Sequence, residues 1–268
     1  MGWPVAHSRS PLIHNHWIQQ YQLNGAYGLF PVPPEKLHEA ILGIKALGLA
    51  GCNVTIPHKV TAMQHMDWVD PLAQQMGAIN TVVLQPNGEL HGFNTDGIGY
   101  IQSLKDEDAN WQADERPIVV IGAGGAARGI VLSLIHAGAS HIRLVNRTNA
   151  NALAMADEFG PAVTAVAWSQ RHECLSDASL LINTTNQGMD GQAALDLDLA
   201  QLPESALVSD AIYIPLETPL LQQARARGNT TINGLGMLLN QARPGFEAWF
   251  GVSPEITPSL KQKLIDSI

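Results

Sequence analysis

A short apolar run that leads directly into a glycine-rich turn lies near the middle of the chain. Residues 118–121 read Ile-Val-Val-Ile, which is typical of a strand buried on both faces. The turn at 122–129 (GAGGAARG) is followed by a stretch whose apolar side chains share one helical face, and Gly138 is its expected stop. A second apolar run at 142–145 completes a strand–turn–helix–strand unit. This order predicts a pair of parallel strands.

The rest of the chain divides into two patterns. After residue 145, strand-like runs at 179–183 and 206–212 alternate with helical segments at 150–159 and 220–227, which predicts a doubly wound α/β sheet. Residues 1–95 form a different unit: we expect helices at 11–21 and 34–47, strands at 51–56 and 81–84, and a hairpin that joins 82–84 to 90–93 through an Asn-Gly turn. We expect 105–116 to be a polar surface loop, and Pro244-Gly245 to break or kink a helix that starts at Gly236.

Composition excludes several classes of protein. Fifteen Lys and Arg against 24 Asp and Glu give a net charge of −9, which argues against a nucleic-acid partner. The sequence has neither the roughly 18 to 20 apolar residues of a membrane span nor a secretion signal. We therefore expect a cytoplasmic protein, with Cys52 and Cys174 as buried thiols and no metal site. His14 and His16 stand two positions apart, so they share no helical face and are expected to be solvated.

The glycine turn has the features of a dinucleotide site. Small residues between a strand and a helix allow a pyrophosphate to approach the backbone amides, and here they are Gly122, Ala123, Gly124, Gly125 and Ala126. An isolated glycine turn is the alternative interpretation, but the flanking strands and helix argue against it.

The residues after the second strand bear on the choice of cofactor. An NAD site places an acidic residue there to bind the ribose hydroxyls, about 20 residues after the glycines. This chain has Asn146, Arg147 and Thr148 instead, which suit a 2′-phosphate, although Arg147 could also be an ordinary surface charge. The sequence therefore favours NADP.

Polar clusters in the first unit stand where helices or strands begin and end. Ser8 and Ser10 precede a predicted helix, and the segments 53–59 (NVTIPHK), 77–81 (GAINT) and 94–97 (NTDG) add amides, hydroxyls, one lysine and one aspartate. Taken singly, such clusters are more often helix caps or turns. Together they are rich in groups that bind a small polyhydroxylated acid.

These clusters, taken in order, resemble the shikimate dehydrogenase family. Seven family motifs occur in the family's order between Ser8 and Ala242, which is nearly the whole chain: S-x-S-P, N-V-T-x-P-x-K, G-A-x-N-T, N-T-D-G, G-x-G-G-A, N-R-T and G-M-L-x-x-Q-A. The resemblance implies an α/β protein with an N-terminal α/β substrate domain (1–95 with 235–268), a Rossmann-type doubly wound NADP-binding domain (96–234), and a cleft between them. It implies reversible NADP-dependent reduction of 3-dehydroshikimate to shikimate, on the route to chorismate and the aromatic amino acids.

The resemblance also implies roles for individual residues. Lys59 and Asp96 would be the catalytic pair, with the sequence leaving open which of them moves the proton. Substrate would be bound by Ser8, Ser10, Asn53, Thr55, Asn80, Tyr213 and Gln241. The cofactor would be bound by the glycine turn, by Asn146, Arg147 and Thr148 at the 2′-phosphate, and by Ala211 and Gly234 at the nicotinamide end.

Some features depart from the family pattern. The family opens with a short strand, and this sequence starts at Met1-Gly2-Trp3, so either the start is assigned too late or the strand is lost; Asn151 also replaces a common basic residue. Two rival functions remain: a quinate or dual quinate/shikimate dehydrogenase that uses NAD, and a non-catalytic NADP-binding module. The sequence leaves both a monomer and a homodimer open.

Overall fold

The computed structural model describes residues 1–113 and 115–268, and the chain contacts divide it into two compact units. The first unit contains Met1–Asp96 and Leu239–Ile268, and the second contains Gly97–Leu238. In the part of the chain that the structure describes, no helix combines the length and apolarity that a bilayer span requires.

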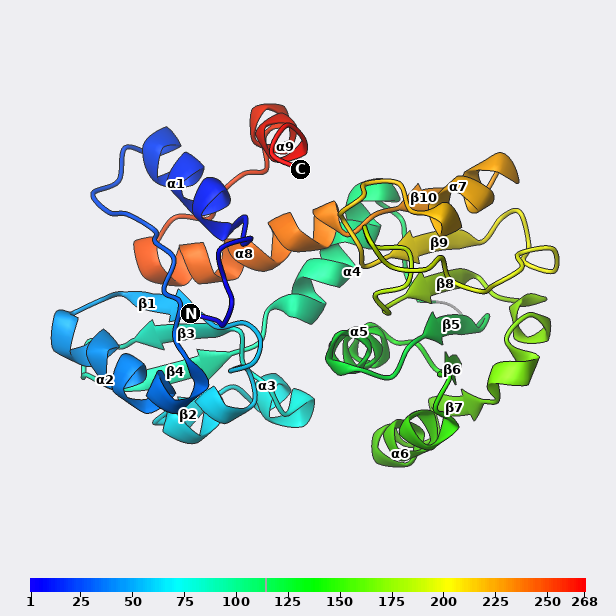
Figure 1. Cartoon of the computed structure of the whole chain (residues 1–268), viewed down its shortest axis with the longest axis horizontal. Coiled ribbons are helices and arrows are strands. Elements are labelled where there is room, and N and C mark those ends of the chain that lie inside the picture. Colours follow the sequence, from blue (N-terminus) through cyan, green and yellow to red (C-terminus); the bar gives the residue numbers. More distant parts are fainter. Residues whose placement is uncertain (114) are drawn as a thin grey trace. The chain divides into compact units, whose positions relative to one another are not determined.

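The first unit is built on a mixed four-stranded sheet in the order β1-β3-β4-β2 (Figure 1). β3 pairs antiparallel with both β1 and β4, and β2 pairs parallel with β4. The predicted hairpin is confirmed, with Val83 opposite His91. The strands are β1 (Gly51–Asn53), β2 (Trp68–Val69), β3 (Thr81–Leu84) and β4 (Leu90–Phe93).

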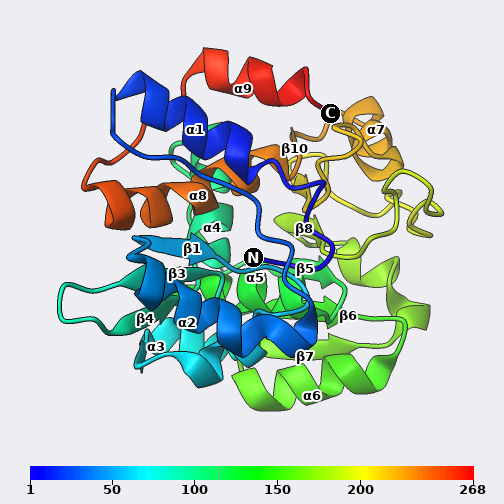
Figure 2. The same cartoon turned by 60° about the vertical axis from the view of Figure 1, so that its left-hand side comes forward.

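Helices pack against this sheet and against one another. Leu37, Ile41 and Ile44 of α2 (Leu37–Leu47) join buried residues of the sheet in one apolar cluster. α1 and α9 lie side by side, blue and red in Figure 2. The other helices of this unit are α1 (Ser10–Gln20), α3 (Pro71–Met76), most of α8 (Leu235–Phe250), α9 (Pro258–Ile265) and short 3-10 turns at Pro34–Lys36 and Thr61–His65.

The second unit is a doubly wound parallel sheet in the order β10-β9-β8-β5-β6-β7. Ile118 and Val120 of β5 enter one apolar cluster, whereas Val119 and Ile121 enter another, so the strand is buried on both faces as its sequence predicts. Its strands are β5 (Ile118–Ile121), β6 (Ile142–Val145), β7 (Val163–Val166), β8 (Leu180–Asn183), β9 (Leu207–Asp210) and β10 (Thr231–Ile232).

The helices of the second unit follow the alternation expected of this fold. They are α4 (Asp96–Glu107), α5 (Gly125–His136), α6 (Asn149–Phe159), α7 (Pro219–Ala226) and the start of α8 (Leu235–Phe250), with 3-10 turns at Trp168–Gln170 and Glu173–Leu175. The strand order reverses between β5 and β8, and in such sheets ligands bind at the carboxyl ends of the strands beside that reversal.

The structure corrects several predicted elements. β1 ends at Asn53 rather than at residue 56, because the His58 amide turns back to the Thr55 carbonyl. The segment at 34–47 is a 3-10 turn followed by α2. α4 extends to Glu107, into the predicted loop at 105–116, of which position 114 lies outside the described residues.

Of the break or kink predicted at Pro244-Gly245, the break does not occur. α8 continues through Pro244 to Phe250. Ala242 and Phe246, on either side of the proline, are almost fully buried, and this packing offsets the loss of one backbone hydrogen bond.

Candidate active site

Lys59 and Asp96 form an ion pair in the first unit. The Lys59 Nζ donates to Asp96 Oδ2 at 2.5 Å. Lys59 lies after β1, and Asp96 is the first residue of α4, where a carboxylate is favoured by the helix dipole. The two side chains remain 28% and 25% exposed, so the pair is held by the protein but open to a ligand.

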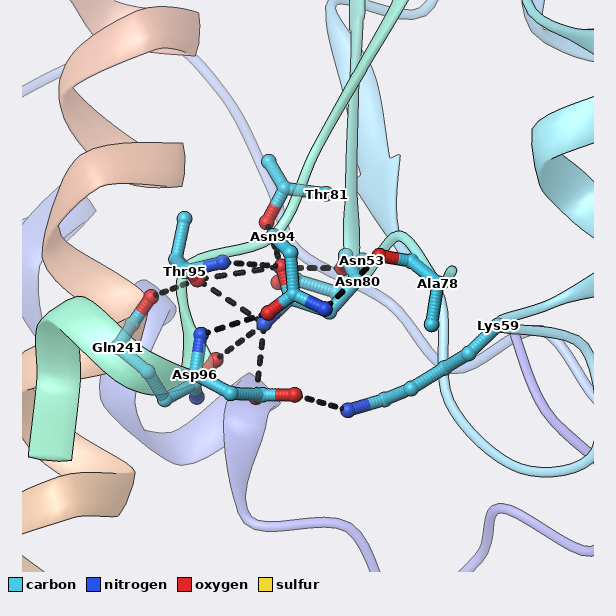
Figure 3. A network of polar contacts seen from close by, with 9 residues as sticks. All are labelled: Asn53, Lys59, Ala78, Asn80, Thr81, Asn94, Thr95, Asp96 and Gln241. Carbon is cyan, nitrogen blue, oxygen red and sulfur yellow. Dashed lines mark hydrogen bonds and ion pairs between the residues drawn. The ribbon is translucent and has the colours of Figure 1, made fainter. Parts of the chain in front are cut away.

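Asn80 holds the second oxygen of the Asp96 carboxylate (Figure 3). Its Nδ2 lies 2.9 Å from Asp96 Oδ1, 3.0 Å from Thr95 Oγ1 and 3.4 Å from Gln241 Oε1. Its Oδ1 accepts from the Thr95 amide at 3.0 Å, and this backbone donor fixes which way the side-chain amide points. Asn80 is only 3% exposed, so Asp96 is oriented by a buried group.

Asn53 joins the network from the end of β1. Its Nδ2 lies 3.1 Å from both the Asn80 carbonyl and Thr81 Oγ1, and Thr81 Oγ1 donates to Asn80 Oδ1 at 2.8 Å. Its Oδ1 accepts from the Tyr27 hydroxyl at 2.7 Å. Asn53 is thus connected to Asp96 through Thr81 and Asn80.

Two further contacts anchor the start of α4. The Asn94 side chain accepts from the Asp96 amide at 3.0 Å and donates to the Ala78 carbonyl at 2.9 Å. Thr95 Oγ1 lies 2.7 Å from the Gln241 carbonyl of α8. The structure therefore brings Asn53, Lys59, Asn80, Asp96 and Gln241 together, although they come from separate segments of the chain.

The remaining predicted substrate residues lie outside the hydrogen-bond network around Asp96 that Figure 3 shows. Ser10 begins α1, and its amide donates to Ser8 Oγ at 3.3 Å. Thr55 is half-buried just after β1, with its amide bonded to the Met1 carbonyl. Tyr213 is half-buried in the second unit, after β9.

The glycine turn of the second unit requires a glycine at its first position. Gly122 has φ +111°, and a Cβ there would lie 2.5 Å from Thr184 Oγ1. A Cβ at Gly124 or Gly125 would meet no atom within 4 Å, so the backbone at the start of α5 is open to a ligand. Ala127 is fully buried, which allows α5 to pack closely on the sheet.

A cavity of about 510 Å³ adjoins this turn at the carboxyl ends of the strands. The Asn146 side chain connects the glycine turn to the segment after β6. Its Oδ1 accepts from the Ala123 amide at 3.2 Å, and its Nδ2 donates to the Thr148 carbonyl at 2.8 Å. Arg147 is exposed at the cavity and, among the described residues, its guanidinium has no partner. The lining residues are Ile121, Gly122, Asn146, Arg147, Thr148, Asn151, Trp168, Thr185, Asn186, Gln187, Gln192 and Ala193.

These donors fit the adenosine 2′-phosphate end of NADP. A guanidinium, an amide and a hydroxyl surround a cavity whose described lining residues include no Asp or Glu. Trp168, Thr185 and Gln192 also line this cavity, although no motif in the sequence marks them, because the sheet topology brings them there.

Ala211 and Gly234 meet after β9 and β10. The Gly234 amide donates to the Ile212 carbonyl at 2.9 Å, and a Cβ at Gly234 would lie 2.2 Å from the Ala211 carbonyl oxygen. Only glycine fits this contact between backbones.

Two predictions about titratable side chains are wrong. His14 is fully buried rather than solvated, because it lies on the inner face of α1 and stacks on Tyr27. Cys174 is half-buried, whereas Cys52 is buried as predicted, and both are free thiols. Throughout 1–113 and 115–268, no three His, Cys, Asp or Glu residues cluster as metal ligands.

Comparisons with known proteins identify relatives along the whole chain. A family model described as the shikimate dehydrogenase substrate binding domain matches residues 1–82, and one described as shikimate / quinate 5-dehydrogenase matches residues 104–189. Shikimate dehydrogenase (NADP(+)) of Paramagnetospirillum magneticum is 48% identical over 261 residues, which covers 97% of this chain and 95% of that protein.

Solved structures extend the similarity to the fold. The shikimate 5-dehydrogenase of Thermus thermophilus, in complex with NADP(H) and shikimate, is 37% identical with a TM-score of 0.87, and the match covers 100% of this chain and 97% of that one. The quinate dehydrogenase of Corynebacterium glutamicum, in complex with NAD, has a TM-score of 0.90 at 27% identity, covering 99% and 96% of the two chains. The fold by itself therefore does not separate these two activities.

Proposed function

The chain belongs to the shikimate dehydrogenase family, and from this membership we propose that it catalyses the reversible NADP-dependent reduction of 3-dehydroshikimate to shikimate. The observation that carries the proposal is the Lys59–Asp96 ion pair, whose carboxylate is oriented by the buried Asn80. The proposed role is in chorismate and aromatic amino acid biosynthesis.

Oxidation of an alcohol needs two acceptors. When bound, NADP⁺ supplies the hydride acceptor, and a protein group must take the hydroxyl proton. We assign proton transfer to Lys59: its ammonium gives the proton to the carbonyl oxygen during reduction, and its neutral amine takes the hydroxyl proton during oxidation. Asp96 accepts a hydrogen bond from the reacting hydroxyl and orients it. Both side chains are partly exposed, so the substrate oxygen can reach either of them.

The other substrate contacts follow from their chemistry. We assign the carboxylate of the substrate to the hydroxyls of Ser8 and Ser10, beside the start of α1. The ring hydroxyls are assigned to the polar groups of Asn53, Thr55, Asn80, Tyr213 and Gln241. In this proposal residues 1–95 with 235–268 form the substrate domain, and residues 96–234 form the NADP domain.

Cofactor choice is assigned to the cavity at the ends of β5 and β6. Asn146, Arg147 and Thr148 would hold the 2′-phosphate, and the amides of Gly122, Ala123, Gly124, Gly125 and Ala126 would approach the pyrophosphate. Ala211 and Gly234 would lie at the nicotinamide end. We place the protein in the cytoplasm, which its two free thiols support.

Initial-rate measurements with shikimate and with quinate, each with NADP⁺ and with NAD⁺, test the proposal. We expect the highest kcat/KM with shikimate and NADP⁺. A preference for quinate and NAD⁺ would favour a quinate dehydrogenase, and NADP⁺ binding without turnover of either acid would favour a non-catalytic module. The 48% identity to a shikimate dehydrogenase, against 27% to a quinate dehydrogenase, supports the first outcome.

A further inference from the structure

Tyr27 contacts one of the proposed substrate residues, although no motif points to it. It lies in the segment between α1 and the 3-10 turn at Pro34–Lys36. Its hydroxyl donates to Asn53 Oδ1 at 2.7 Å, and the Ser10 side chain is near enough to affect the pKa of the phenol. The phenol therefore restrains the residue that ends β1 and lies near the residue that begins α1.

The Tyr27 ring is held in place by its surroundings. It stacks on the buried His14 ring, with centroids 4.2 Å apart and planes at 4°, and its centroid lies 6.0 Å from that of Trp249. The Asn15 side chain accepts from the Tyr27 amide and donates to the Tyr27 carbonyl, both at 2.9 Å. The hydroxyl position is thus fixed by packing and by α1.

This hydroxyl is a donor at neutral pH, as in any tyrosine. Burial raises the pKa of Tyr27 above its ordinary value, so the phenol stays protonated into alkaline solution. Both Asn53 amide hydrogens already point at the Asn80 carbonyl and Thr81 Oγ1. The Tyr27 hydroxyl supplies the donor that Asn53 Oδ1 requires, which completes the restraint on that side chain.

We propose that Tyr27 is a positioning residue for substrate binding, which holds the side chain of Asn53 in the arrangement that receives the polyhydroxylated acid. This role rests on the proposed function, because it acts through a residue that function assigns to the substrate. Tyr27 itself has no assigned contact with substrate or cofactor.

The network predicts which kinetic constant depends on Tyr27. Asn80 is restrained independently by the Thr95 amide, and the Asp96 amide is bonded to Asn94. Loss of the Tyr27 hydroxyl therefore removes one restraint on the Asn53 side chain but leaves the Lys59–Asp96 pair in place. The effect should appear in KM for shikimate and not in kcat.

Tyr27→Phe removes the hydroxyl and keeps the stacked ring. Tyr21→Phe is the matched control, because the Tyr21 hydroxyl also has a hydrogen-bond partner, the Glu255 amide at 3.0 Å, outside the network. We expect Tyr27→Phe to raise KM for shikimate about five-fold, as for loss of one hydrogen bond. Its kcat and its KM for NADP⁺ should stay near the wild-type values, as should all three constants of Tyr21→Phe.

The same substitution in an Asn53→Ala background tests whether Tyr27 acts through Asn53. Much of the KM effect of Tyr27→Phe should disappear there, since its main partner is gone. The proposal is overturned if Tyr27→Phe behaves like Tyr21→Phe, if kcat falls while KM is unchanged, or if the effect is undiminished in the Asn53→Ala background. The last comparison remains decisive even if Tyr27→Phe lowers the melting temperature. A wild-type protein that binds NADP⁺ but does not oxidise shikimate would instead refute the proposed function.

Discussion

Lys59 and Asp96 are 37 positions apart in the sequence, and their charged groups lie 2.5 Å apart in the structure. The carboxylate is shared: one oxygen accepts from the lysine, and the other accepts from Asn80. This division keeps the ammonium and the carboxylate in a fixed relation while both remain reachable. The substrate oxygen can then meet the proton-transferring lysine and a hydrogen-bond acceptor together.

Lys59→Ala should reduce kcat for shikimate oxidation by about 10²- to 10⁴-fold, the range for loss of a general acid–base group. KM for shikimate should change much less, because other side chains bind the ring. Steady-state kinetics measure both constants. Lys45→Ala is the control, since Lys45 also pairs with an aspartate, Asp67, at 2.8 Å. If Lys59→Ala raised KM by as large a factor as it lowered kcat, the role of Lys59 would be misassigned.

Arg147→Ala should weaken the binding of NADP⁺ and leave the binding of NAD⁺ nearly unchanged. Charge-assisted hydrogen bonds to the 2′-phosphate contribute about 1.5–3 kcal/mol, so KM for NADP⁺ should rise about 10- to 100-fold. KM for NAD⁺ should stay within about two-fold, because NAD⁺ lacks that phosphate. Arg225→Ala serves as control, as Arg225 pairs with Glu217 and does not line the cavity. A parallel loss of affinity for both cofactors would contradict the assignment.

Gly122→Ala should destabilise the protein more than Gly138→Ala. Both glycines have positive φ, +111° and +100°, but only at Gly122 would the new Cβ clash, lying 2.5 Å from Thr184 Oγ1. Backbone strain alone costs about 1–3 kcal/mol, and the clash at Gly122 should add about 1–2 kcal/mol. Urea unfolding measures both values. Equal destabilisation by the two variants would contradict this prediction, because it would show that Thr184 moves away from the new Cβ with no loss of unfolding free energy.

His14→Phe should reduce the sensitivity of stability to acid. Burial among aromatic rings lowers the pKa of His14 from 6.5 to about 3, so between these values the folded state keeps it neutral while the unfolded state protonates it. Unfolding then takes up a proton, and stability falls as pH drops below 6.5. At pH 5 the loss due to His14 is about 2 kcal/mol.

Urea unfolding at pH 7 and pH 5 measures this effect. The decrease in unfolding free energy between the two pH values should be smaller in His14→Phe than in the wild type. His16→Phe, on the same helix but only half-buried, is the control and should change the decrease less. The same decrease in wild type and His14→Phe would contradict the burial argument.

The sequence by itself determined the elements whose signals are local. The run at 118–121, the glycine turn and the run at 142–145 specify strand, turn and strand because β-branched side chains and glycine restrict the backbone wherever they stand. Arg147 is likewise placed at the end of β6 by counting along the chain. The family motifs, taken in their order along the chain, marked Lys59, Asn80 and Asp96.

Only the tertiary structure decided which polar groups meet. Asn80 and Gln241 are 161 positions apart, and no local pattern encodes the hydrogen bond between them. Tyr27 and His14 look like an ordinary loop tyrosine and an ordinary polar histidine until packing stacks their rings on each other and buries His14. α8 continues through Pro244 because its buried side chains offset a local penalty. Burial and long-range hydrogen bonds depend on the whole fold, so these features follow from the assembled structure and not from any one segment of the chain.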